Sequence, residues 1–178
     1  MKKLRPNLTP EDNADMPIEP TDFESGLGED DLIDLRIWLR LLTCTNLIER
    51  RIRKNLGKKF DTTLPRFDVL AQLDRTSDGQ PMRELSKRLM VTKGNITSLV
   101  DRLEEDELVD RQTSPRDRRV QNIQLTKNGQ AAVTKMIPEH NAWLTDIMAG
   151  LDRNAAMDLH ALLGELKKSI LLNQDEDI

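Results

Sequence analysis

The stretch Asp117–Gly129 reads D-R-R-V-Q-N-I-Q-L-T-K-N-G, and it decides the fold. Before it, Leu108–Thr113 has the composition of a β-strand, and Val120–Leu125 alternates like a second one. The turn between them is Ser114–Asp117, in which Pro115 presets the φ angle of a tight turn. We therefore predict a β-hairpin that leads directly into a helix.

The predicted hairpin is strongly cationic. Four arginines lie on it or beside it, namely Arg111, Arg116, Arg118 and Arg119. The negative potential of a narrow minor groove attracts guanidinium groups without base-specific hydrogen bonds. Thr126 suits the N-cap of the helix that follows. The pattern also fits an ordinary solvated hairpin, so the preceding segment has to separate the two interpretations.

That segment predicts two helices joined by a tight corner. Met82, Leu85 and Leu89 recur at spacings of three and four, and the corner follows at Val91. The second helix has one apolar face, formed by Ile96, Leu99, Val100 and Leu103. Its N-cap and other face carry short polar or cationic side chains that suit base and phosphate contacts: Thr92, Lys93, Asn95, Thr97, Ser98 and Arg102.

The second helix ends in four acidic residues, 104–107. They oppose the helix dipole and would be repelled by phosphate, so we expect this end to point away from DNA. The predicted elements are, in order, a helix, a tight corner, a helix with a polar face and a basic hairpin. This order is that of a winged helix-turn-helix. The sequence therefore predicts a mainly α protein with a small β-hairpin wing that binds double-stranded DNA.

The chain resembles the MarR family of regulators. The family's wing pattern, D-x-R-x-x-x-(hydrophobic)-x-L-T, is met here by Asp117, Arg119, Ile123, Leu125 and Thr126. The preceding L-S-K-R-L-x-V-T-x-G-N-I-T-x-L-V-D-R-L-E is also similar to its two central helices, and the resemblance covers roughly residues 32 to 172.

The resemblance implies a homodimeric regulator whose wing arginine, Arg119, enters the minor groove while Asp117 steadies it. One position departs from the family pattern. Glu107 stands where the family usually has glycine, and a glycine there would serve a left-handed helix cap. We therefore expect a mildly strained or differently shaped corner at this position.

We predict five parts along the chain. Residues 1–29 form an acidic arm too poor in apolar groups to fold, 30–62 a long first helix, and 63–126 the DNA-binding lobe. Residues 127–173 form C-terminal dimerisation helices, and 174–178 an acidic tail. The arm is either a solvated tail or a segment that competes with DNA for the basic face.

The long helices carry the remaining apolar surface. In the first, from Asp30 to about Lys59, we expect a buried stripe formed by Leu41, Thr45, Ile48, Ile52 and Leu56. Further helices are predicted at Leu64–Leu73, from Lys127 to about Ala149, and at Asn154–Leu172. The last helix is crowded with apolar residues, which predicts that a second subunit covers it. A two-fold dimer also suits an inverted-repeat operator.

The net charge of −4 hides an uneven distribution. The chain has 27 cationic and 31 anionic residues. Residues 1–34 hold three of the cations and ten of the anions, and the tail holds three further anions. The remaining part has 24 cations against 18 anions, a net charge of +6. Local cationic density is the quantity that matters for DNA, so the acidic total does not argue against DNA binding.

Other classes of protein lack support in the sequence. No signal peptide and no apolar run of about 20 residues is present, and the single cysteine fits a reducing cytoplasm. No H-x-x-x-H, C-x-x-C, G-x-S-x-G or phosphate-binding glycine loop occurs, so we predict no enzyme, metal site or cofactor.

Cys44 raises the alternative of a redox-switched repressor, because some members of the resembled family sense peroxides through a cysteine on the first helix. Such sensing needs a lowered thiol pKa and hydrogen-bond donors, which are commonly tyrosines. This chain has no tyrosine. We therefore expect Cys44 to pack in the core.

A ligand site is suggested by residues of two helices. Met136, His140, Trp143 and Ile147 step by four, three and four, which places them on one helix face. Arg36, Trp38 and Arg40 lie near the start of the first helix. An imidazole beside an indole can orient an aromatic or acyl ligand while arginines hold its anion. The alternative is a core histidine with a packing tryptophan.

The resemblance implies that this ligand cleft lies between the first helix, the fifth helix and the DNA-binding lobe. The strings R-I-W-L-R-L-L-T-C-T-N-L-I-E and E-H-N-A-W are similar to a branch that controls the breakdown of plant aromatic acids and answers to hydroxycinnamoyl-CoA thioesters. We expect a repressor released by a small aromatic or aryl-CoA ligand. A winged-helix module that binds protein instead of DNA is the competing interpretation.

Overall fold

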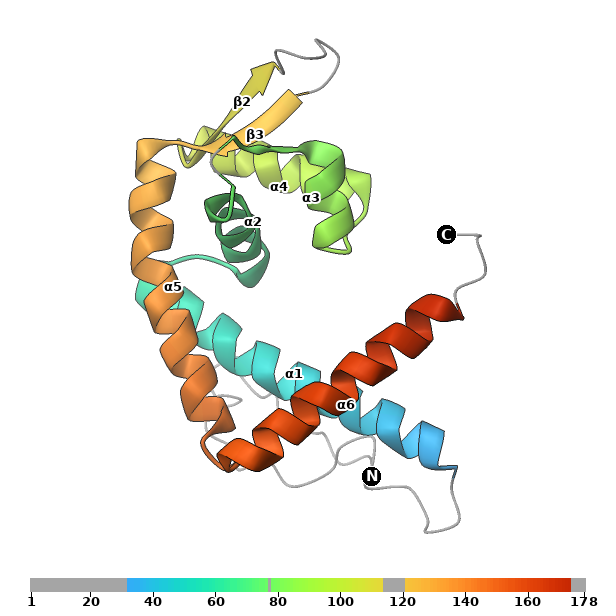
Figure 1. Cartoon of the computed structure of the whole chain (residues 1–178). Coiled ribbons are helices and arrows are strands. Elements are labelled where there is room, and N and C mark those ends of the chain that lie inside the picture. The colour runs from blue at the N-terminus through green and yellow to red at the C-terminus, as the bar shows by residue number, and fades with distance from the viewer. Residues whose placement is uncertain (1–31, 77, 114–120, 174–178) are drawn as a thin grey trace, which may run out of the picture. The chain divides into compact units, whose positions relative to one another are not determined.

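The computed structural model describes residues 32–76, 78–113 and 121–173 of the chain. Their elements follow the order α1 (Ile33–Phe60), α2 (Leu64–Asp74), β1 (Gln80–Pro81), α3 (Met82–Arg88), α4 (Lys93–Glu105), β2 (Val109–Thr113), β3 (Gln121–Leu125), α5 (Lys127–Met148) and α6 (Arg153–Leu172), as Figure 1 shows. The predicted mainly helical fold with a small β wing is confirmed. The chain divides within α1 into two compact units, one ending at Arg50 and one beginning at Arg51.

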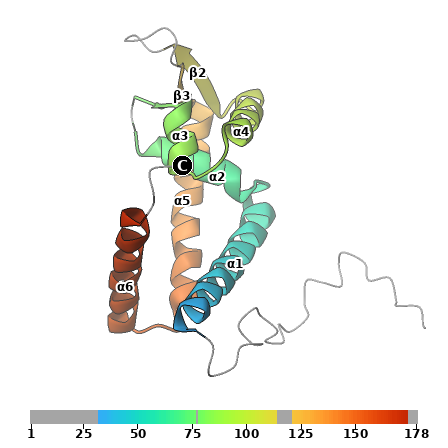
Figure 2. The same cartoon turned by 90° about the vertical axis from the view of Figure 1, so that its right-hand side faces the viewer.

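The wing belongs to an antiparallel sheet of order β1-β3-β2. Ile123 in the central strand pairs with Arg111 on one side and with Gln80 on the other, and its side chain is fully buried. Figure 2 shows β2 and β3 next to α3 and α4 at one end of α5. The sequence did not predict β1, because two residues, one of them proline, give no periodic signal.

The core of the second unit is built around α2. Its buried side chains lie on more than one face, because α2 packs against α4, α5 and β3. The buried apolar residues of the unit are Ile52, Leu56, Phe67, Val69, Leu70, Leu73, Leu85, Ile96, Val100, Leu103, Val109, Ile123, Val133 and Met136. Burying side chains of this size contributes about 1.5–3 kcal/mol each. This core therefore fixes the two helices and the hairpin that were predicted to contact DNA.

The buried stripe predicted for α1 is only half correct. Ile52 and Leu56 are buried, whereas Leu41 and Ile48 are partly exposed and Thr45 is exposed. Within the single chain, only the last turns of α1 contribute to the core of the second unit.

Cys44 was predicted to pack in the core, and this prediction is wrong, because the residue is exposed on α1. It precedes Ile52 by eight residues and Leu56 by twelve, which turns it about 80° and 120° away from them around the helix. Its thiol is therefore off the face that the core covers.

Two glycines are required by close backbone approach. Gly79 has φ +70°, and a Cβ there would lie 2.5 Å from the carbonyl oxygen of Ile123. Gly129 is buried in the first turn of α5, and a Cβ there would lie 1.9 Å from the carbonyl oxygen of Leu108. Any larger residue at Gly129 would push α5 away from the corner between α4 and β2.

Among the described residues, three with side chains adopt the left-handed conformation, namely Asp61, Met90 and Glu107, with φ of 49°, 53° and 58°. Met90 forms the corner between α3 and α4, and Glu107 the corner between α4 and β2. L-residues pay about 1–2 kcal/mol for this conformation, which glycine avoids. The strained corner expected at Glu107 is thus confirmed.

Replacing Glu107 with glycine should raise the free energy of unfolding by about 1 kcal/mol, because the steric cost of the left-handed conformation is removed. Urea denaturation measures this change. Glu107→Ala removes the same charge but keeps the Cβ, so it should give no such gain. Equal effects of glycine and alanine would show that the charge, and not the backbone conformation, governs this position.

The arm predicted at residues 1–29 and the tail predicted at 174–178 lie outside the described residues. No helix in the ranges that the structure covers is long and apolar enough to cross a membrane.

Candidate nucleic-acid interface

Helix α4, the predicted recognition helix, begins at the residue that the sequence predicted. The hydroxyl oxygen of Thr92 accepts a hydrogen bond from the backbone N–H of Asn95 at 3.3 Å, so Thr92 is the N-cap. The first turn of α4 holds no acidic residue. The partial positive charge of this helix end is therefore left to attract an anion such as a phosphate.

The two faces of α4 are divided as predicted. Ile96, Val100 and Leu103 are buried, whereas the residues expected to contact DNA are exposed: Thr92, Lys93, Asn95, Thr97, Ser98 and Arg102. The hydroxyl of Thr97 donates to the carbonyl oxygen of Lys93 at 2.8 Å. Only the acceptor lone pairs of that hydroxyl remain available to a base.

Three of the predicted contact residues lie side by side. Asn95, Ser98 and Arg102, at spacings of three and four, line a shallow depression together with Val91, Leu99 and Pro65 at the start of α2. Lys93 and Thr97 do not line it. The structure therefore brings together one amide, one hydroxyl and one guanidinium group, a set that can both donate to and accept from base edges.

Strand β2 is tied to α4 through Arg111. Its guanidinium group forms ion pairs with Asp101 and Glu104, which lie three residues apart on one side of α4. The Arg111 side chain is 24% exposed. Sequence analysis counted Arg111 among the cations on or beside the hairpin but did not foresee that two carboxylates of α4 pair with it. The missed signal was a cation on the first strand of the hairpin, seven and ten residues after two acids of the preceding helix.

The acidic end of α4 has partners inside the lobe. Asp106, directly after the helix, forms an ion pair with Arg66 of α2, and Glu104 is one of the partners of Arg111. These acids thus hold α2 and β2 against α4. That this end points away from DNA stays a prediction.

The predicted wing-tip residues Arg116, Asp117, Arg118 and Arg119 lie outside the described residues. The two strands that flank them are described, and their register pairs Thr113 with Gln121. The interface that the structure describes therefore consists of α4 and the base of the hairpin.

Known proteins resemble the chain in sequence and in fold. A model of the MarR family matches residues 60–120. A helix-turn-helix transcriptional regulator of Bacillus cereus without assigned function is 35% identical over 114 residues, 64% of this chain and 74% of the relative. The regulator PecS of Dickeya dadantii is 33% identical over 132 residues, which cover 72% of this chain and 78% of PecS.

A solved structure with this fold is the MarR family regulator Sco3205 of Streptomyces coelicolor in complex with DNA. It matches 84% of this chain and 94% of its own with a TM-score of 0.72 and 20% identity. The chain belongs to the MarR family. It is a DNA-binding transcription regulator and not an enzyme, as the sequence predicted.

The residues that were predicted to hold a ligand of this MarR regulator lie on two helices. Arg36, Trp38 and Arg40 are on α1, where Trp38 is exposed. His140 and Trp143 are on α5 and are partly buried. The first three belong to one unit and the last two to the other, and each set is described by itself.

On α5, both aromatic side chains rest against phenylalanines. The rings of His140 and Phe67 lie 4.7 Å apart between centroids, and those of Trp143 and Phe60 lie 6.2 Å apart. Burial lowers the pKa of His140, and a side-chain hydrogen bond with Asn141 partly offsets this. Burial therefore favours the neutral form of the His140 imidazole.

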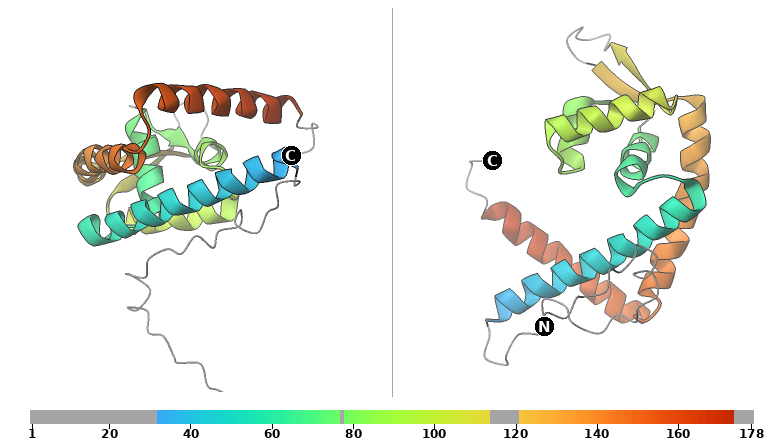
Figure 3. Two further views of the ribbon diagram at one scale, coloured as in Figure 1. Left: turned by 90° about the horizontal axis from the view of Figure 1, so that it is seen from below. Right: turned by 180° about the vertical axis from the view of Figure 1, so that it is seen from behind.

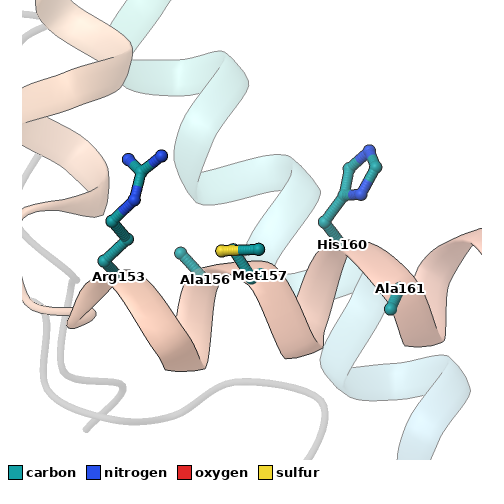
Figure 4. A pocket seen from close by; sticks show the side chains of 5 residues that line it. All are labelled: Arg153, Ala156, Met157, His160 and Ala161. Carbon is teal, nitrogen blue, oxygen red and sulfur yellow. The ribbon is translucent and has the colours of Figure 1, made fainter.

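Helix α6 of the MarR regulator presents an uncovered apolar surface. Figure 4 shows Arg153, Ala156, Met157, His160 and Ala161, which line an open depression made by this helix alone. Among the described residues of α6 none is buried, and its large exposed apolar side chains are Met157, Leu159, Leu162, Leu163, Ile170, Leu171 and Leu172. Contiguous apolar surface of this kind marks an interaction site.

Replacing Arg111 with glutamine should lower the free energy of unfolding by about 1 kcal/mol and weaken DNA binding, because β2 loses its ion pairs to α4. The stability change is kept small by solvent screening of the partly exposed carboxylates. Urea denaturation at low and high salt measures it. Arg83→Gln is the matched control, since the Arg83 side chain in the Arg83–Glu84 pair is 83% exposed. A double-mutant cycle of Arg111→Gln with Glu104→Gln that gives no coupling would contradict this role.

Proposed function

We propose that this MarR regulator binds an inverted-repeat operator as a homodimer, with the N-terminal half of α4 in the major groove. One observation carries the proposal: Asn95, Ser98 and Arg102 lie together on an exposed face next to an acid-free helix N-terminus. Lys93 and the Thr92 cap lie at the same end and would contact phosphate. Thr97 would contribute its acceptor lone pairs.

The wing would supply the second contact. Arg119 would enter the minor groove, Asp117 would hold it in position, and Arg116 and Arg118 would contact phosphates. The support is the wing pattern of the sequence and the cationic charge that it places between β2 and β3. Because Arg111 joins β2 to α4, the two DNA contacts would be carried on one rigid lobe.

Dimerisation is supported by apolar surface that one chain leaves exposed. Besides the side chains of α6, α1 exposes Ile33, Leu35, Ile37, Trp38 and Leu47, and Leu32 directly before it is exposed as well. We propose that residues 30–62 and 127–173 form the dimer, while residues 63–126 contact the operator. A two-fold dimer places the two copies of α4 to meet two half-sites one helical turn apart.

We further propose that the protein is a cytoplasmic repressor released by a small aromatic or aryl-CoA ligand, with hydroxycinnamoyl-CoA thioesters as the first candidates. Arg36 and Arg40 would hold the anion of the ligand, and Trp38, His140 and Trp143 its aromatic part. The partly buried imidazole of His140, whose neutral form is favoured by burial, supports this assignment, because that form can bond to a ligand without a charge penalty. A redox switch through exposed Cys44 is the alternative mode of release.

Two classes of α4 variant should differ in the kind of DNA binding that they lose. Asn95→Ala and Ser98→Ala should change which sequences are selected from random DNA, because their side chains would contact base edges. Lys93→Ala should keep the selected sequence and reduce the salt dependence of binding by about one counterion. Equal sequence preferences for Asn95→Ala and the parent would rule out base reading by this face. If the protein were instead a winged-helix module that binds protein, it would bind no genomic DNA fragment.

Effector and operator should each weaken the protein's affinity for the other by the same factor. Calorimetric titration of hydroxycinnamoyl-CoA into the protein, with and without operator, should show a coupling of about 1–3 kcal/mol, or roughly 5- to 150-fold. Arg40→Ala and His140→Ala should abolish it. Cys44→Ser, an exposed residue of α1, should respond like the parent. If both pocket variants respond like the parent, the ligand binds elsewhere.

A further inference from the structure

Met90, at the corner between α3 and α4, has a large apolar side chain that the folded lobe leaves in solvent. The side chain is 91% exposed. Among the described residues from 63 to 126, no other large apolar side chain is exposed, and the remaining exposed ones of the described chain lie on or beside α1, α5 and α6. The surfaces proposed to form the dimer therefore account for the others but not for Met90.

The backbone of Met90 is also unusual for a residue with a side chain. Its N–H donates to the carbonyl oxygen of Lys87 at 3.3 Å, and the N–H of Val91 donates to that of Ser86 at 3.1 Å. These two hydrogen bonds form a Schellman motif, in which glycine usually occupies the left-handed position. Met90 has φ 53° there, a conformation that a Cβ makes unfavourable. Neither backbone preference nor burial within the chain explains a methionine at this position.

The corner lies next to the face of α4 that is proposed to contact bases. Thr92, two residues after Met90, is the N-cap of α4, and Val91 lines the depression together with Asn95 and Ser98. Two residues span at most about 7 Å, so the Cα atoms of Met90 and Thr92 are no farther apart than this. Figure 3 shows α3 and α4 meeting at the corner, at the end of α4 opposite to the start of β2. The Met90 side chain therefore extends the exposed face of α4 beyond its first residue.

Three cations flank Met90 along the chain. Lys87 and Arg88 lie in the last turn of α3, Lys93 opens α4, and all three are exposed. Within the described ranges none of them takes part in an ion pair. Uncompensated cations of this kind attract the phosphates of a duplex. An apolar side chain among such cations suits the rim of a DNA groove, where phosphates border the base edges.

The chemistry of the major groove limits what an apolar side chain can contact there. Base edges in this groove present hydrogen-bond donors, hydrogen-bond acceptors and one apolar group, which is the 5-methyl group of thymine. A methionine side chain is unbranched and polarisable, so it adapts to apolar surfaces of irregular shape. Thymine is therefore the base that Met90 fits best.

We propose that Met90 contacts the 5-methyl group of a thymine in each operator half-site, next to the bases contacted by Asn95 and Ser98. The inference rests on the proposed function, in which the N-terminal half of α4 lies in the major groove. Lys87 and Arg88 contact the phosphates beside that thymine. Burial of the Met90 side chain in the complex offsets its unfavourable backbone conformation. The contact adds a preference for thymine that the hydrogen-bonding side chains of α4 do not supply.

Removal of the methyl group from each thymine in turn tests the proposal. The probe is the duplex that the parent protein selects from random DNA, with single thymines replaced by uracil. At one thymine in each half-site, uracil should weaken binding by the parent about fourfold, the factor expected for one buried group of methyl size. Met90→Gln keeps the length of the side chain but not its apolar character. In this variant, uracil at that position should have no effect, whereas uracil elsewhere should act as in the parent.

Met90→Gly separates the loss of this contact from damage to the fold. Glycine removes the Cβ from a left-handed position, so the urea midpoint should rise above that of the parent. Binding to the selected duplex should nevertheless become weaker, and the same uracil effect should disappear. Met90→Gln should keep the urea midpoint of the parent. A variant that is more stable than the parent and binds DNA less tightly does not owe its weaker binding to unfolding.

The remaining outcomes distinguish this contact from other roles of Met90. Uracil effects that are the same in the parent and in Met90→Gln at every thymine would overturn the proposal, and so would equal affinities of the parent and Met90→Gly for the selected duplex. A change in self-association of Met90→Gln, measured by sedimentation, would assign Met90 to a contact between two copies and would also overturn it. A parent protein that selects no sequence from random DNA would instead contradict the proposed function on which the inference rests.

Discussion

The carbonyl oxygen of Leu108 accepts a hydrogen bond from the backbone N–H of Thr126 at 3.1 Å, and Gly129 packs against the same group. The Thr126 hydroxyl donates to the carbonyl oxygen of Glu107 at 2.6 Å and accepts from the N–H of Gly129 at 3.0 Å. These contacts bind the end of α4, the start of β2 and the start of α5 to one another. The recognition helix and the hairpin thus share one frame, on which any joint contact with DNA depends.

Arg111 adds a second connection of a different physical kind. The contacts of Leu108, Thr126 and Gly129 are short backbone and hydroxyl contacts that salt hardly changes, whereas the ion pairs of Arg111 with Asp101 and Glu104 are partly exposed and weaken with salt. Salt therefore acts on such a regulator twice, through the phosphate contacts and through the connection of β2 to α4. The backbone junction keeps the lobe intact when the ion pairs are screened.

Local signals in the sequence were enough to predict most of this lobe. The caps Thr92 and Thr126 and the strained corner at Glu107 follow from short-range backbone chemistry, which one chain contains in full. The exposed face of α4 followed from helical periodicity. What the sequence did not reveal depends on distant partners. Strand β1 exists only because Gln80 pairs with Ile123, and the role of Arg111 required knowing which side of α4 faces β2.

The wrong placement of Cys44 and of the first half of α1 has a related cause. Apolar spacing shows which face of a helix is to be buried, but not whether the same chain or a partner buries it. The same limit applies to charge. The acids at residues 104 and 106 look repulsive to DNA in the sequence, yet they are paired with Arg111 and Arg66. Pairing removes charges of both signs from the field of the lobe, so the field near α4 is set by the charges that remain unpaired and not by the net charge of the chain.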